Sequence, residues 1–146
     1  ERLVGKSGEG RLWHPDGLYR GKSEVIKQHI KFQRLVKYIR ENRTRPPEII
    51  FKGAKAINAG IHQSGPNIMT EVLITYNPDA FPIVNNNQVN ALRKAGCELN
   101  DPSRFSPSDY ADYCALCREI RKVLKLDSML AVDTLLNRVY WENKRK

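Results

Sequence analysis

The sequence predicts an all-α domain of about six helices, and three observations lead to this prediction. Apolar residues recur with a period near 3.6 along most of the chain after residue 22, as on one face of a helix. Helix-starting residues precede these segments, and Gly or Pro ends them. The apolar run at 81–84 lacks this period and contains a proline, which disfavours a central strand.

Length and composition indicate one small basic domain. The 146 residues include 25 Lys and Arg against 16 Asp and Glu, a net charge of +9. With 40% hydrophobic and 28% charged residues the composition is typical of a globular protein. The sequence has neither a long apolar span nor a secretory signal, so we expect a cytoplasmic protein that does not enter membranes. Because it starts at Glu1 without Met, we expect it to be part of a larger protein.

The N-terminal half divides into an entry segment and the first helices. Residues 1–22 contain five glycines and form a loop-rich entry segment, with a short hairpin near Trp13 and Tyr19. Residues 23–146 form a single helical domain. Its first helix starts after Ser23 and stops near Asn42, before two prolines. A short helix follows over 47–57, with Pro47 at its first position.

The remaining helices have clear start and stop signals. Pro66 opens a helix that ends at Tyr76, and an asparagine run opens another that ends at Gly96. Residues 106–109, Ser-Pro-Ser-Asp, are a capping box for a helix whose apolar stripe runs to Val123 and Leu124. The last helix starts at Ser128 and carries Trp141 near its end.

Metal, cofactor and redox sites are not predicted. Cys114 and Cys117 form a C-x-x-C, but they lie inside a helix and lack two further ligands, so we interpret them as buried thiols. His29 is assigned to the core or its rim. Glu71, within an apolar helix, is interpreted as a solvated residue or a tether between helices.

Basic residues recur at helical spacing on two helices. A stripe of like charge is compatible with an ordinary solvated face, but two stripes and the net charge of +9 favour binding of a polyanion. The stripes consist of Lys27, Lys31 and Arg34 on the first helix, and Arg118, Arg121, Lys122 and Lys125 on the fifth.

Residues 57–69 read as helix, glycine-bounded turn, helix. Free backbone N–H groups at the second helix start can hold a DNA phosphate, and small residues allow close approach; an ordinary connection between helices is the alternative. The residues predicted to bind here are Gly60, His62, Ser64, Gly65 and Asn67.

The stretch from Gly60 to Gly96 resembles the helix-hairpin-helix core of the DNA glycosylase superfamily. The hairpin corresponds to residues 60–65, and the family's Pro-Val-Asp-x-x-Val segment to 82–89, Pro-Ile-Val-Asn-Asn-Asn-Gln-Val. In this alignment Asn86 takes the place of the catalytic aspartate, and nothing matches the family's lysine. The resemblance therefore implies DNA binding without the family's chemistry.

A second resemblance covers roughly residues 60–140. The segments 77–85, Asn-Pro-Asp-Ala-Phe-Pro-Ile-Val-Asn, and 129–133, Met-Leu-Ala-Val-Asp, are similar to helical domains fused to effectors of bacterial restriction and phage-defence systems. This implies an accessory module for nucleic-acid recognition, with a catalytic domain fused to it or associated with it.

The leading hypothesis is a non-catalytic DNA-binding module. Asn85, Asn86, Asn87 and Gln88 are predicted to read base edges, with helix capping as the alternative for Asn85 and Asn86. RNA remains an alternative partner. One rival hypothesis is a protein-interaction or regulatory module of a larger effector. The other is an enzyme acting on a flipped base, with Glu71, Asp79 or Asp133 as the acid.

Overall fold

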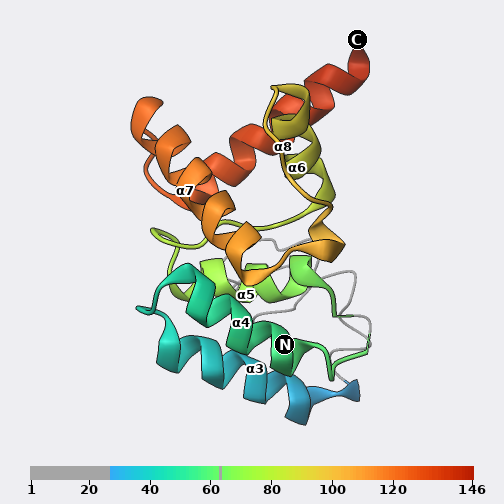
Figure 1. The fold of residues 1–146 in the computed structure, drawn as a ribbon, viewed down its shortest axis with the longest axis vertical. Helices are drawn as coiled ribbons and strands as arrows, with labels where there is room; N and C mark the ends of the chain where they lie inside the picture. The colour runs from blue at the N-terminus through green and yellow to red at the C-terminus, as the bar shows by residue number, and fades with distance from the viewer. Residues whose placement is uncertain (1–26, 63) are drawn as a thin grey trace, which may run out of the picture.

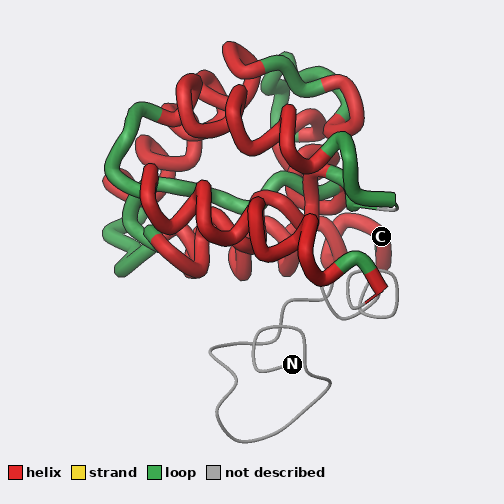
Figure 2. The backbone as a smooth tube through the Cα atoms, turned by 90° about the horizontal axis from the view of Figure 1, so that it is seen from below, coloured by secondary structure: helices red, strands yellow, loops and turns green. Residues whose placement is uncertain are grey.

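The computed structural model describes residues 27–62 and 64–146, and the predicted all-α fold is confirmed there. The backbone of this part consists of helices and loops, with no strand (Figure 2). The hairpin predicted within residues 1–22 and the helix start at Ser23 lie outside the described residues.

Six α-helices and one short 3-10 helix make up the described fold. In chain order they are α3 (His29–Asn42), α4 (Pro47–Asn58), α5 (Pro66–Tyr76), α6 (Asn86–Lys94), η1 (Pro102–Arg104), α7 (Pro107–Val123) and α8 (Met129–Arg145).

The helix ends follow the local signals in the sequence. Ser106 and Asp109 form a reciprocal capping box at α7, and Ser128 caps α8 through the N–H of Ala131. After α6 the chain turns at Gly96, whose φ of 99° lies in the left-handed region. Local chemistry thus sets most of the boundaries.

The helices form two groups that pack through α4 and α7 (Figure 1). One group contains α3, α4 and α5, which contact one another. In the other group, α8 packs against both α6 and α7. Aromatic rings fill the α4–α7 contact, where Phe51 stacks on Tyr110 with ring centroids 4.5 Å apart. A single core therefore joins both groups.

The segment 81–84 is buried although it is not a helix or a strand. The hydroxyls of Tyr110 and Tyr113 donate to the carbonyls of Pro82 and Ile83, each over 3.0 Å. The Val84 N–H donates to Oγ1 of Thr70 on α5 over 2.9 Å. These bonds pair three polar groups of the buried backbone and fix where α6 begins.

Two sequence-based assignments of buried residues are wrong. His29 is exposed, because the buried face of α3 is formed by Phe32, Leu35 and Ile39 and does not include it. Val123 and Leu124 are 67% and 52% exposed, because the end of α7 projects from the fold before the chain reverses (Figure 1).

Candidate functional site

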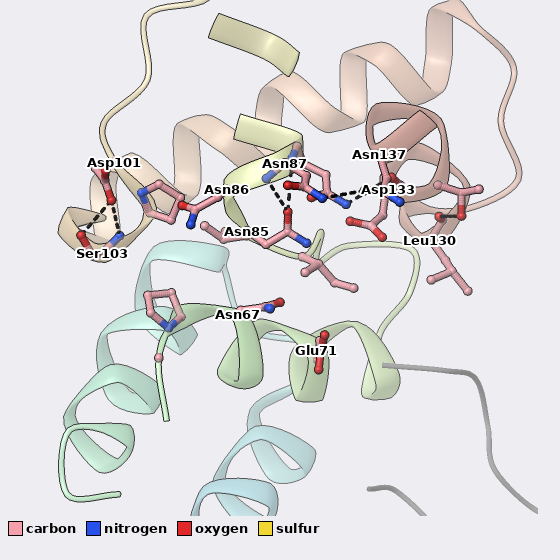
Figure 3. Close-up of a pocket in the computed structure, with 17 residues that line it drawn as sticks. Asn67, Glu71, Asn85, Asn86, Asn87, Asp101, Ser103, Leu130, Asp133 and Asn137 are labelled. Carbon is pink, nitrogen blue, oxygen red and sulfur yellow. Dashed lines mark hydrogen bonds between the residues drawn. The ribbon is translucent and has the colours of Figure 1, made fainter. Parts of the chain in front are cut away.

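A polar cleft of about 780 Å³ opens between the two helix groups (Figure 3). Residues from the start of α5 lie on one side, and residues from α6, η1 and α8 lie on the other. Six predicted binding residues line it: Gly65, Asn67, Asn85, Asn86, Asn87 and Gln88. Chain segments about 20 residues apart thus form one site.

The asparagine run at the start of α6 has three different roles. The Asn85 side chain accepts from the N–H groups of Asn87 and Gln88, so it caps the helix. The Asn87 amide donates to Oδ1 of Asn137 on α8 over 3.0 Å. Asn86 is exposed at the cleft and makes no side-chain hydrogen bond within the described residues. The capping alternative is therefore correct for Asn85, and Asn86 is available to a ligand.

Two amide oxygens in the cleft lining accept no hydrogen bond from the described residues. Gln88 is 2% exposed, and its Nε2 donates to the Asp133 carbonyl over 3.4 Å, whereas its Oε1 has no partner within the described part of the chain. The buried Oδ1 of Asn67 likewise has no partner there. An unsatisfied buried acceptor costs about 1–3 kcal/mol. The cleft is therefore suited to a ligand that donates hydrogen bonds.

Acidic side chains also line this cleft. Glu71 on α5 is only 3% exposed, and Asp133 faces the cleft from α8 (Figure 3). Asp101, at the edge, accepts from the hydroxyl and N–H of Ser103, and these hydrogen bonds lower the pKa of its carboxyl. Asp79 lies elsewhere, paired with Arg121. Two of the three acids named for a base-acting enzyme are therefore at the cleft.

The connection between α4 and α5 is held by Asn58, which sequence reasoning did not single out. Its side-chain amide donates to the carbonyls of Ser64 and Gly65, and its Oδ1 accepts from the Ser64 hydroxyl. The main chain of His62 pairs with the side chain of Gln28 through two hydrogen bonds. Gly60, His62 and Ser64 thus shape the turn, and they are not among the residues that line the cleft.

The helix that follows this turn has no side-chain cap. Gly65 is the N-cap of α5, and Pro66 occupies the first helical position. Within the described residues, the N–H groups of Asn67 and Ile68 in the first turn therefore receive no capping side chain. This helix start lies at the cleft and adds backbone donors to its rim.

The two predicted basic stripes lie along α3 and α7, with Lys27 just before α3 and Lys125 just after α7, and none of their residues lines the cleft. Within residues 27–62 and 64–146, Lys31 and Arg34 form no ion pair, and all three residues of the α3 stripe are exposed. Of the second stripe, Arg118 and Lys122 on α7 and Lys125 just after it are exposed.

Arg121 differs from the rest of its stripe. Its guanidinium donates to the carbonyls of Asp79, Leu126 and Asp127, and it pairs with the Asp79 carboxylate over 3.0 Å. The reversal after α7, with φ of 53° at Lys125, brings the carbonyls of 126 and 127 back to this side chain. Its donors are used within the molecule, so we assign it a structural role.

The cysteines and histidines do not form a metal cluster within the described residues. Cys114 and Cys117 are buried as interpreted, and burial raises the pKa of both thiols. In the same part of the chain no helix is long and apolar enough to cross a membrane.

Sequence reasoning missed the contribution of α8. Leu130, Asp133, Thr134 and Asn137 line the cleft from one face of this helix, spaced at i, i+3, i+4 and i+7. The polar half of that spacing was visible in the sequence, but no neighbouring element could be assigned to it.

Comparisons with known proteins add no relative. No protein-family model, curated protein or solved structure matches the chain.

Proposed function

We propose that this chain is a non-catalytic module that recognises nucleic acid, with DNA as the first candidate and RNA as the alternative. The observation that carries the proposal is the cleft between the helix groups, where four carboxamides from α5 and α6 converge beside the capping Asn85: Asn67, Asn86, Asn87 and Gln88. Asn and Gln side chains match the donor and acceptor pattern of bases, adenine above all.

The charge distribution supports the same proposal. The net charge is +9, and within the described residues four exposed cations of α3 and α7 form no ion pair: Lys31, Arg34, Arg118 and Lys122. Such cations attract phosphates. The more phosphates they contact, the more steeply the affinity falls as the salt concentration rises. The start of α5 offers backbone N–H donors for a phosphate at the rim of the cleft. This is the role that the helix-hairpin-helix resemblance implies for the turn before it. The resemblance to helical domains of restriction and phage-defence effectors leads us to propose further that the chain belongs to such a protein in the cytoplasm.

Fluorescence anisotropy with labelled duplex, single-stranded and RNA oligonucleotides at two salt concentrations tests this function. We expect binding in the micromolar range or tighter that weakens steeply with salt. The double variant Arg118→Glu and Lys122→Glu removes two exposed cations of α7, and its affinity should fall at least about tenfold at low salt.

A charge-matched control separates the effect of the two α7 cations from the effect of the protein's net charge. Arg40→Glu with Lys94→Glu changes the net charge equally at two exposed positions outside the stripes. We expect this control to lose much less affinity than the α7 variant. Equal losses in both variants would assign the effect to net charge alone, and no binding to any oligonucleotide at low salt would refute the proposed function.

One observation favours a second candidate, an enzyme that acts on a flipped base. Glu71 is almost fully buried at the cleft, and Asp133 lies across from it. Incubating the same oligonucleotides and assaying for base release or strand cleavage decides between the two candidates. The non-catalytic module leaves the oligonucleotides intact, whereas turnover that is lost in Glu71→Gln would establish the enzyme.

A further inference from the structure

The face of α8 that lines the cleft continues beyond it. Trp141 and Lys144 follow Asn137 by four and seven residues, so they lie on the same face of the helix. Trp141 is 47% exposed, and Nζ of Lys144 lies 5.4 Å from its ring centroid. Figure 1 shows this end of α8 extending to one end of the molecule. A polar cleft thus leads to an aromatic and basic surface.

We propose that the cleft and this face of α8 bind a single-stranded segment of nucleic acid, with one unpaired base in the cleft and a neighbouring base stacked on Trp141. The inference rests on the proposed function and names the ligand of its site. Four helical residues separate Asn137 from Trp141, about 6 Å along the axis. Adjacent nucleotides can span that distance.

Electrostatics decide which part of the nucleotide enters the cleft. Among the described residues the lining includes Glu71 and Asp133 but no Lys or Arg, so a phosphate would find no cationic side chain there. A neutral base needs no such partner. The volume of about 780 Å³ lies within the range of ligand pockets, roughly 300–1,000 Å³.

The free acceptors decide which bases fit. Oε1 of Gln88 and Oδ1 of Asn67 are buried without a partner in the described residues, so they favour a base that donates hydrogen bonds. Adenine, cytosine and guanine carry exocyclic amino donors, whereas thymine has no amino group and donates only through N3–H. The cleft is therefore selective for amino-bearing bases.

Outside the cleft, the α8 surface supplies the sequence-tolerant part of the affinity. Every base has a π face, so stacking on Trp141 depends little on sequence. Lys144 and the exposed Arg145 and Lys146 follow Trp141 and can neutralise phosphates of the strand beyond the stacked base. The cleft therefore selects the base, and the α8 surface around Trp141 binds the strand whatever its sequence.

Anisotropy titrations with labelled dA, dC and dT oligonucleotides, the matching RNA and a blunt duplex test the inference. We expect single strands to bind more tightly than the duplex, and dA and dC more tightly than dT by roughly 5- to 100-fold. RNA of the same bases shares this chemistry, and the DNA and RNA titrations distinguish the two sources.

Two variants and a control locate the binding. Trp141→Ala should weaken all single strands by roughly 5- to 100-fold. Ile49→Ala removes a side chain that is also 47% exposed, on α4, and should leave binding unchanged. Gln88→Met keeps the side-chain volume and removes Oε1, so the preference for dA and dC should fall. Asn67→Ala, at a less buried position, gives the same test if Gln88→Met does not fold.

The outcomes separate this inference from the function on which it rests. Salt-sensitive binding that is equal for duplex and single strands and insensitive to Trp141→Ala would overturn the inference and leave the binding module standing. Equal affinity for dA, dC and dT would overturn the role of the cleft. No binding to any nucleic acid would overturn both.

Discussion

Cys114 shows at the scale of one residue how the core controls chemistry. Its side chain is fully buried on α7, and burial raises the pKa of the thiol to about 12, although Tyr110 and Arg118 act in the opposite direction. The same cause raises the pKa of Cys117 further. Because the thiolate is the reactive form, both thiols are inert in the folded protein.

Alkylation at pH 8 checks this prediction. We expect one thiol per chain, that of the half-buried Cys97, to react with iodoacetamide under native conditions and all three to react in denaturant. Mass spectrometry counts the adducts. Rapid native labelling of Cys114 or Cys117 would mean that α7 is not packed as the structure shows.

The same burial makes stability depend on pH in one direction. The folded state keeps the Cys114 thiol protonated, so its contribution is fully present below the unfolded pKa of about 9. As pH rises from there toward about 12, the unfolded chain loses the proton first and the free energy of unfolding falls.

Among elements, α6 depends most visibly on its cap. Asn85 accepts from two backbone N–H groups that otherwise have no partner in the helix. Asn85→Ala should lower the free energy of unfolding by about 1 kcal/mol, and Asn85→Asp should retain most of it because a carboxylate also caps and favours the helix dipole. Urea denaturation measures both. Equal stability of all three proteins would show that the cap contributes nothing.

Helices and their ends were predictable because their signals are local. Pro47, the Ser106–Asp109 box and Gly96 each act within a few residues, and the structure places them as the sequence predicts. The 3-10 helix η1 was not predicted, since three residues carry no periodicity.

The sequence pattern of α8 did not reveal that its polar face lines a cleft. Val132 and Leu136 are buried on one face, whereas Asp133 and Asn137 line the cleft on a second face. A polar residue on an amphipathic helix is usually solvated, so its spacing alone does not reveal a facing element. Only the packing of α8 against α6 gives these residues a partner.

At the scale of the whole molecule, the cleft exists because two helix groups meet along α4 and α7. The asparagines at 85–87 were recognised from sequence as base-reading candidates, yet their convergence with Asn67 depends on the buried segment before α6. That segment is fixed by two tyrosine hydroxyls and Thr70, contacts made across 28, 30 and 14 residues. Such long-range bonds leave no pattern in a sequence.

Arg121 also joins segments that are far apart in the sequence, and substituting it tests how much these contacts stabilise the fold. Its guanidinium joins α7 to Asp79 in the α5–α6 connection and to the turn before α8. A lysine carries one ammonium group and cannot reproduce this planar set of donors. Arg121→Lys should therefore lower the free energy of unfolding by about 1–3 kcal/mol.

Nucleic-acid binding distinguishes this structural role from the role assigned to its neighbours. The charge is unchanged in Arg121→Lys and the donors of Arg121 are already used, so we expect its affinity for any oligonucleotide to equal that of the parent protein. Arg118 and Lys122, three residues before and one after, should instead alter affinity with little effect on stability, because both are exposed. Paired urea and anisotropy measurements on these variants give the comparison. If Arg121→Lys weakened binding and left stability intact, Arg121 would contact the ligand. All four residues of the predicted α7 stripe would then belong to the binding surface.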